Sequence, residues 1–477
     1  MGPPSQLPQR LGLFDTTTIV VGSMIGSGIF LTPSIMAQWV ETPGILLGLW
    51  VFAGLFTFLG ALCYAELASM MPRAGGQYVF LTEAFGRFWG FLYGWTLFLV
   101  IQTGFNAAVA IAFAKYLGVF VPALGEANVL VSAPVGQWLP SFLGNVVEPS
   151  WCFEINSAQV VGCAVIALLT GVNILGVREG ATVQNLFTVL KLVALGCLIA
   201  VGLPHVGENL ANFTPWIEPR PGPEALHIGF AAGLAVALSK ALFAYDAWNS
   251  GTFVAEEVRR PEKTVPRALL LGSLVVMSVY VLTNVAYLAN LPIDQMAKVR
   301  ENRVAEPVAT ALFGPVGATL VVVTILISTF GCVNGMILSG ARVCYAMARQ
   351  GLFFRSCAAL HRRSRTPATA LVYQGAWSCV LAISGSYSAL LTYSVFASVL
   401  FGALTVAGVY QLRATQPQRP RPYRCWGYPI TPALYLAAAY PFLLYVVVGD
   451  PEATRIGLFL VMTGVPVYLA WRQRERD

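Results

Sequence analysis

The sequence predicts an all-α, polytopic membrane protein with twelve transmembrane helices. Of its 477 residues, 57% are hydrophobic and only 11% are charged, whereas soluble domains carry about 25% charged residues. The apolar residues gather in runs long enough to cross a bilayer, which takes about 20 residues. The basic residues gather in the short segments on one side of these runs. Composition, run length and charge distribution therefore predict the same class.

Taken in order, the apolar runs predict twelve spans within a single transmembrane domain, 1–477. The expected spans are 14–39, 43–70, 88–117, 158–176, 182–203, 228–257, 266–290, 312–347, 367–384, 388–412, 432–448 and 455–471. The long run 312–347 is expected to tilt or to extend past the bilayer. The longest loop is 119–157, and 291–311 is expected to hold a short surface helix.

The charges orient these spans. With the N-terminus inside, 21 of the 29 Lys and Arg residues fall in inner segments and six in outer ones, while Lys191 and Lys240 lie within spans. This distribution follows the positive-inside rule and predicts a multi-pass protein of the plasma or inner membrane with both termini cytoplasmic. The net charge of +7 is spread over short loops, which excludes a nucleic-acid-binding domain.

Several function classes lack their sequence signals. The nine cysteines form no CxxC pair and the three histidines no HExxH pair, so we expect neither a metal site nor a cofactor. No nucleophile with a base and no pair of catalytic carboxylates stands out, so an enzyme is not predicted. A receptor would be expected to have seven spans or a soluble sensing domain, and a channel a repeated pore loop.

Two spans contain residues that a plain membrane anchor avoids. The first, VVGSMIGSGIFLTP, has Gly22, Gly26 and Gly28 in its middle, and the sixth has Asp246 and Asn249. Glycines alone are equally typical of close helix packing. However, these spans open two five-helix halves, 14–203 and 228–412, and broken helices at corresponding positions indicate an inverted-repeat transporter. The ends of a broken helix bind an anion and a cation, which suits a zwitterionic amino acid.

At these residues the chain resembles a known family. It is similar to the amino acid–polyamine–organocation superfamily, and within it to bacterial relatives of the L-type amino acid transporters. The motifs that carry the resemblance are GSMIGSGIF at 22–30, AELASMMPRAGGQY at 65–78, VQNLFTVLK at 183–191, LFAYDAWN at 242–249, AEEVRRPEKTVPRA at 255–268, STFGCVNG at 328–335 and RPYRCWGYP at 421–429. The last motif looks bacterial.

The resemblance implies a LeuT-type fold: a five-plus-five inverted repeat with helices one and six broken, followed by two additional helices at 432–471. It implies a secondary transporter of amino acids that works by alternating access, and favours an exchanger of neutral L-amino acids. The alternatives are a proton-coupled amino acid importer and an antiporter of cationic amino acids or polyamines.

The resemblance also implies the substrate site. Backbone N–H groups of Ser27 and Gly28 would receive the substrate carboxylate, carbonyls of Met24 and Ile25 would approach its amino group, and Phe243 would close over it. The complete expected set is Met24, Ile25, Gly26, Ser27, Gly28, Phe243, Ala244, Asp246, Asn249 and Ser398. The family usually has Gly at the position of Ala247.

Two lysines within spans need separate explanations. The resemblance places Lys191 where sodium-coupled relatives hold sodium, near Ser328 and Thr329, which implies sodium-independent transport; the alternative is a lysine that snorkels from a span end. Lys240 has three interpretations: it neutralises Asp246, it favours an acidic substrate, or it faces a neighbouring helix without a role.

Further polar residues are expected around the gates and loops. Glu66 and Arg73 are interpreted either as part of an inner gate or as a helix end and its turn. Glu256 and Glu257, followed by Arg259 and Arg260, are expected to form an interfacial ion-pair cluster rather than part of a substrate site. Cys152 lies near the position at which animal relatives bond a heavy-chain subunit, but the bacterial character of the C-terminal motif favours a free thiol and no such partner. The expected partners are an amino acid substrate and the lipid bilayer.

Overall fold

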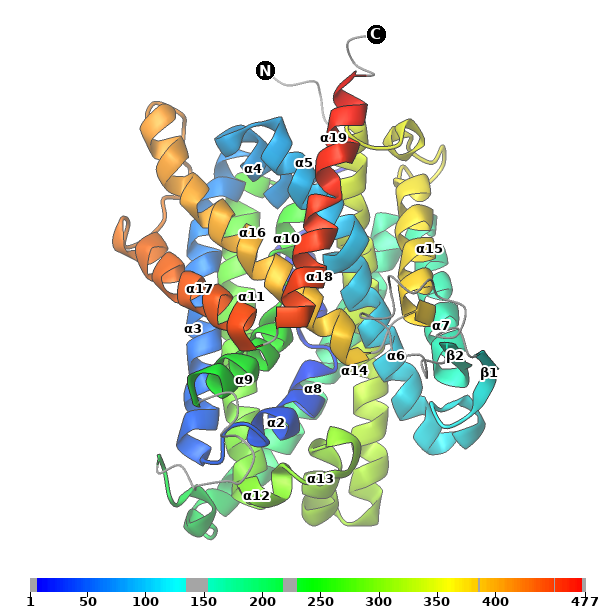
Figure 1. The fold of residues 1–477 in the computed structure, drawn as a ribbon, viewed down its shortest axis with the longest axis vertical. Coiled ribbons are helices and arrows are strands. Elements are labelled where there is room, and N and C mark those ends of the chain that lie inside the picture. Colours follow the sequence, from blue (N-terminus) through cyan, green and yellow to red (C-terminus); the bar gives the residue numbers. More distant parts are fainter. Residues whose placement is uncertain (1–6, 134–152, 218–229, 385–386, 450, 474–477) are drawn as a thin grey trace, which may run out of the picture.

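The computed structural model describes residues 7–133, 153–217, 230–384, 387–449 and 451–473. Long helices pack side by side into one bundle (Figure 1). Helix α4 (Gln77–Phe85) and the end of α19 (Gly464–Gln473) lie at one end of the bundle, at the top of Figure 1. Helices α12 (Ile293–Met296) and α13 (Ala305–Phe313) lie at the opposite end. We call these the α4 end and the α12 end.

The helices follow the predicted runs closely. The remaining elements are α1 (Leu13–Met24), α2 (Gly28–Ala37), α3 (Pro43–Met70), α5 (Arg87–Thr96), α6 (Gln102–Phe120), α7 (Ser157–Leu175), α8 (Val177–Gly202), α9 (Phe230–Tyr245), α10 (Ser250–Phe253), α11 (Pro261–Asn290), α14 (Pro315–Arg349), α15 (Ala368–Ser384), α16 (Tyr387–Thr415), α17 (Ile430–Gly449) and α18 (Pro451–Met462), with strands β1 (Val129–Ala133) and β2 (Phe153–Asn156). A π-helical turn at Leu97–Ile101 joins α5 to α6.

Within the described residues, nine helical segments are long and apolar enough to cross a membrane, and three shorter apolar helices accompany them at Gly233–Tyr245, Ala368–Ser384 and Gly457–Trp471. The predicted class, a helical polytopic membrane protein, is confirmed at this level. The count of twelve spans and the inverted repeat stay predictions.

Local sequence explains where several helices begin. Proline occupies the first turn of α3, α11 and α14, where its missing N–H costs nothing. The α7 helix begins with a capping box, in which Asn156 and Gln159 each accept the other's backbone N–H, at 3.0 and 2.8 Å.

The structure departs from the predicted elements in one loop and one span, and it contains the surface helix predicted in a second loop. The predicted loop 119–157 contains an antiparallel pair of strands, β1 and β2, and the predicted surface helix in 291–311 appears as α12 and most of α13. The predicted span 312–347 was wrong at its start, because Gly314 adopts φ +67 and separates α13 from α14. This left-handed conformation favours glycine.

Two helices are interrupted inside the bundle. The first interruption separates α1 from α2 at Ile25–Ser27, and the second separates α9 from α10 at 246–249. Since α2 packs against α9 and α1 packs against α10, the two breaks face one another in the core. We call them the first break and the second break.

Candidate functional site

Lys191 occupies the first break from the side. It lies on α8, is fully buried, and its ammonium donates to the carbonyls of Gly22 at 2.9 Å, Ile25 at 2.6 Å and Ser328 at 2.8 Å. An ammonium has three donors, so these carbonyls satisfy all of them. The side chain therefore ties α8 to α1, to the break and to α14, and does not extend toward a span end.

The other residues expected near Lys191 differ in position. The Ser328 hydroxyl donates to the Ile25 carbonyl at 3.0 Å, so Ser328 contacts the break as well as the lysine. The hydroxyl of Thr329 donates to Ile325, one turn back in its own helix, at 2.7 Å. Thr329 is therefore placed beside this cluster without a side-chain bond to it.

The second break is held open by an unusual backbone. Ala247 adopts φ +65, a conformation that costs an alanine free energy and a glycine almost none. The Asp246 carboxylate accepts the N–H of Ala247 at 2.5 Å, and Asn249 donates to the Gln77 side chain at 2.8 Å. Among the described residues, no cationic side chain pairs with Asp246.

The end of α9 bears on the first interpretation of Lys240, neutralisation of Asp246. No ion pair between these two residues is present in the described part of the chain, and Lys240 has an interaction of its own. Six residues separate them, and α9 ends at Tyr245, so a helical advance of about 100° per residue points the two side chains in different directions. Of the three interpretations of Lys240, neutralisation of Asp246 lacks support in this arrangement.

Two small cavities meet at Asp246. The first cavity, about 20 Å³, lies between the breaks; its walls include Met24, Gly26, Ser27, Gly28, Phe243, Ala244, Asp246 and Cys332. The second cavity, about 30 Å³, lies beyond Asp246; its walls include Tyr64, Gln77, Tyr245, Asp246, Asn249 and Ser398. Nine of the ten expected substrate residues line one or both cavities. Ile25 lines neither, because its carbonyl faces Lys191.

The cavities are too small for an amino acid, since each has room for about one water. The breaks touch closely: a Cβ at Gly28 would lie 2.8 Å from the Cα of Ala244, and one at Gly26 would lie 2.8 Å from the sulfur of Cys332. The rings of Phe105 and Phe243 pack at 5.5 Å between centroids. The structure is therefore closed around the site, and binding requires the helices to separate.

Tyr280 is a site residue that sequence reasoning missed. It is fully buried on α11, and its hydroxyl lies 3.0 Å from the carbonyl of Met24 and 3.0 Å from that of Ala244. One hydroxyl thus contacts the last turns before both breaks. Because Tyr280 is one of two tyrosines in an apolar helix, nothing in the sequence marks it.

Ion pairs join helices to one another at the α4 end of the bundle. Glu257 and Arg342, both fully buried, pair through two contacts of 2.8 and 3.2 Å, and Glu256 pairs with Arg349 at 3.4 Å. The expected ion-pair cluster is thus present. The arginines that pair with the two glutamates in these contacts lie on α14, whereas Arg259 and Arg260 had been expected beside them. Such a pair is strongly destabilised when one member is removed.

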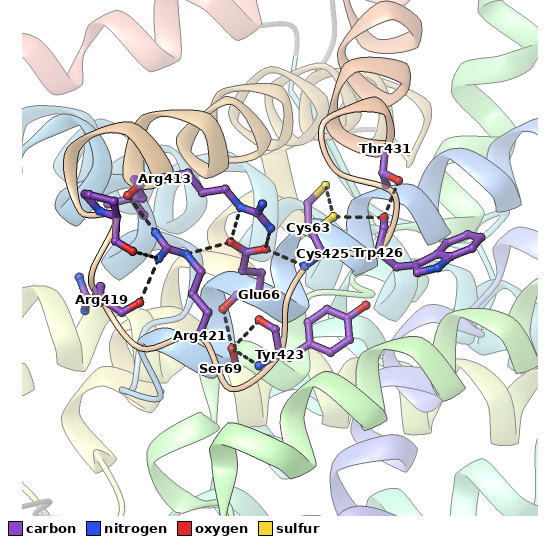
Figure 2. A network of polar contacts seen from close by, with 12 residues as sticks. Cys63, Glu66, Ser69, Arg413, Arg419, Arg421, Tyr423, Cys425, Trp426 and Thr431 are labelled. Carbon is purple, nitrogen blue, oxygen red and sulfur yellow. Dashed lines mark hydrogen bonds and ion pairs between the residues drawn. The ribbon is translucent and has the colours of Figure 1, made fainter.

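A second polar network joins α3 to the segment after α16 (Figure 2). The carboxylate of Glu66 accepts two bonds from Arg413, at 2.9 and 2.6 Å, lies 3.2 Å from Arg421, and accepts the N–H of Cys425 at 2.6 Å. Arg73 instead pairs with Glu83 on α4 at 3.5 Å. Glu66 is thus a buried anchor between α3 and α16, and Arg73 belongs to the surface turn.

At the α12 end, α2 is hydrogen-bonded to α12 and to the loop between α12 and α13. Ser34 donates to the carbonyl of Met296 at 2.8 Å, and Gln38 donates to Asn302 at 2.9 Å. Polar contacts between separate segments therefore hold the bundle together at both ends.

Long apolar helices, two facing breaks and a closed central site define a membrane transport protein. The model of the family described as "Amino acid permease" matches residues 11–468. The chain is 32% identical to the large neutral amino acids transporter small subunit 2 of Mus musculus, covering 98% of this chain and 83% of that protein. It is 30% identical to the serine/threonine exchanger SteT of Bacillus subtilis over 98% of both chains, and 30% identical to the Asc-type amino acid transporter 1 of Homo sapiens over 98% and 84%. The chain belongs to the amino acid permease family.

Proposed function

We propose that this protein is a sodium-independent exchanger of neutral L-amino acids that works by alternating access. Relatives that align over nearly its whole length are named as transporters of neutral amino acids or exchangers of serine and threonine. The substrate would bind between the two breaks, in the first cavity, once the helices separate. The protein acts as a transporter and not as an enzyme, and it needs no cofactor or metal for this cycle.

The chemistry of the breaks supports this substrate class. The N-terminal end of α2, at Ser27 and Gly28, supplies backbone N–H groups and the positive end of a helix dipole, which suit a carboxylate. Carbonyls before the breaks and the Asp246 carboxylate suit an ammonium group. A zwitterionic amino acid satisfies both, with its side chain directed between Phe243 and the second cavity, toward Asn249 and Ser398.

Sodium independence rests on a single observation: the Lys191 ammonium bonds to Gly22, Ile25 and Ser328. These carbonyls come from α1, the first break and α14, so a cation between them helps to hold the helices together. A tethered ammonium carries this charge in every state of the cycle. A free sodium ion would then be unnecessary.

The topology that we propose has twelve spans. The first five-helix repeat would cover 14–203, the second 228–412, and two additional helices 432–471. Both termini would be cytoplasmic, in the plasma or inner membrane. The α4 end would then face the cytoplasm, and the Glu257–Arg342 pair would belong to the inner gate.

One observation favours a second candidate. Asp246 lines both cavities without a cationic partner among the described residues. A buried carboxylate in this situation binds either a proton or a cationic substrate group. The alternatives are therefore a proton-coupled importer and an antiporter of cationic amino acids or polyamines.

A heavy-chain subunit is not part of the proposal. One relative is named a small subunit, but the RPYRCWGYP segment has bacterial character. Cys152, the position near which a heavy chain would attach, lies outside the described residues.

Exchange in proteoliposomes tests the proposed function. Vesicles that contain the purified protein are loaded with unlabelled serine, leucine, arginine or no amino acid, and uptake of labelled amino acid is measured. We expect uptake to be stimulated several-fold by neutral amino acids inside and little by arginine. Uptake that is equal in loaded and empty vesicles would reject exchange, and stimulation by arginine alone would favour the second candidate.

A further inference from the structure

A polar cavity of about 700 Å³ lies at the α4 end, away from the two breaks. It is lined by Arg10, Leu11, Asp15, Arg178, Ala181, Thr182 and Arg259. Its three arginines come from three separate places: the segment before α1, the first turn of α8 and the segment before α11. The fold therefore gathers into one cavity three cations that are far apart in the sequence.

The cavity has a surplus of positive charge. The side chains of the three arginines are exposed, and none of them forms an ion pair in the part of the chain that the structure describes. Asp15 is the carboxylate in the lining, and it already accepts bonds from the N–H of Gly12 at 2.8 Å and from Asn185 at 2.7 Å. An anion with several oxygens would satisfy donors that the protein leaves to solvent.

An exposed apolar stripe leads away from this cavity along α8. Arg178 and Thr182 line the cavity, and Leu186, Val189 and Val193 continue the same helix face at spacings of four, three and four residues. These three apolar side chains are 56%, 44% and 59% exposed. Such a face on a membrane helix contacts lipid chains, so Arg178 lies where the lipid headgroups begin.

We propose that this cavity binds the phosphate headgroup of an anionic phospholipid. Arg10, Arg178 and Arg259 hold the phosphate oxygens, and an acyl chain lies along Leu186, Val189 and Val193. The apolar stripe favours a lipid over free phosphate, because free phosphate would gain nothing from it. Basic pockets between membrane helices are a recurrent form of headgroup site.

The site is connected to the closed α4 end through the backbone. Arg10 donates its N–H to the carbonyl of Glu257 at 2.9 Å, and Arg259 donates its N–H to the carbonyl of Leu11 at 2.9 Å. Glu257 in turn forms the buried pair with Arg342. A headgroup that bridges both arginines to Arg178 on α8 therefore strengthens the closed arrangement of this end. The bound lipid stabilises the state in which the α4 end is shut.

Thermal unfolding of the full chain in detergent tests the proposal. Dioctanoyl-phosphatidylglycerol, dioctanoyl-phosphatidylcholine and inorganic phosphate are titrated separately, and the apparent Kd is taken from the shift of the melting temperature. We expect phosphatidylglycerol to raise the melting temperature, with little effect of the other two. Arg178→Gln should weaken its apparent Kd about fivefold, and the further change Arg259→Gln by about the same factor. Arg362→Gln, at an exposed arginine of the α14–α15 loop, is the matched control and should change nothing.

Three results would overturn the proposal: equal shifts with both lipids, a shift with inorganic phosphate as large as that with phosphatidylglycerol, or an unchanged Kd in the Arg178 variant. Native mass spectrometry provides a second readout that does not depend on unfolding. We expect one retained phosphatidylglycerol on the wild type and on Arg362→Gln, and its loss from the double variant. Equal retention by all three proteins would contradict the site.

Discussion

At the first break, three backbone carbonyls meet an ammonium from the same chain; at the second break, a carboxylate lines two cavities and meets no cation among the described residues. The carbonyls of the first break therefore have a donor from the same chain, and the break can close without a free ion. The second break leaves a charge for the substrate or a proton to balance. In the proposed cycle the two charged residues therefore have different roles: Lys191 would act on the closure of the helices, and Asp246 on which substrate is carried.

The largest effect is expected at the contact between the breaks. In Gly28→Val the new Cβ would meet the backbone of Ala244, a collision that no side-chain rotation relieves. The bulkier side chain would also cover the backbone N–H groups proposed for the substrate carboxylate, and a loss of about 3 kcal/mol there would weaken substrate binding about 100-fold. A scintillation proximity assay measures the substrate affinity of the variant. Gly48→Val, where no atom lies within 4 Å, is the control and should bind normally.

A separate experiment tests whether Ser27 and Gly28 bind the carboxylate of the substrate. Amino acid methyl esters lack the anion that the N-terminal end of α2 would receive. They should therefore compete poorly with labelled substrate in the wild type. Competition by a methyl ester as strong as that by the free amino acid would remove the carboxylate assignment from Ser27 and Gly28.

The next largest effect is expected for Lys191→Ala. Three buried carbonyls lose a charged donor, and such bonds contribute about 1.5–3 kcal/mol each. If the free energy of the closed state becomes less favourable by one such contribution, turnover should fall about 10- to 100-fold. Substrate affinity should change by less than about threefold, because Lys191 lines neither cavity. Lys298→Ala, an exposed lysine, is the control. Equal losses in affinity and turnover would show that Lys191 acts on substrate binding as well as on closure.

Asp246→Asn should affect selectivity more than rate. Without the carboxylate, inhibition by lysine or arginine should weaken about tenfold, the equivalent of about 1.4 kcal/mol, while inhibition by serine or leucine changes little. Because no ion pair joins Lys240 to Asp246, a double-mutant cycle with Lys240→Met should be additive within about 0.5 kcal/mol. Recovery of activity in the double mutant would restore the neutralisation hypothesis.

The smallest effect is expected for Tyr280→Phe. It removes one hydroxyl that contacts the carbonyls of Met24 and Ala244, worth about 1–2 kcal/mol. Exchange should slow about fivefold, with little change in the melting temperature. If Tyr280→Phe slowed exchange as much as Lys191→Ala, the contacts of the tyrosine hydroxyl would matter for exchange as much as those of the lysine.

The helices and their breaks could be predicted because each signal is local. Hydropathy marks the long apolar segments, and glycines or an acid within them mark the interruptions. Lys191 could be assigned to the first break by the resemblance alone. Tyr280 could not, because an aromatic residue in an apolar helix is ordinary. The partners of Glu257 and Glu66 lie 85 and 347 residues away, and only the packing of whole helices brings them together.

The most direct test of the account is exchange of labelled neutral amino acid in proteoliposomes with choline in place of sodium on both sides. If the Lys191 ammonium serves where an ion would otherwise bind, the wild type should exchange at the same rate in sodium and in choline. Lys191→Ala should be slow in choline, while Lys298→Ala should match the wild type. Strict dependence of the wild type on sodium, or a maximal rate of Lys191→Ala equal to that of the wild type, would contradict the central claim.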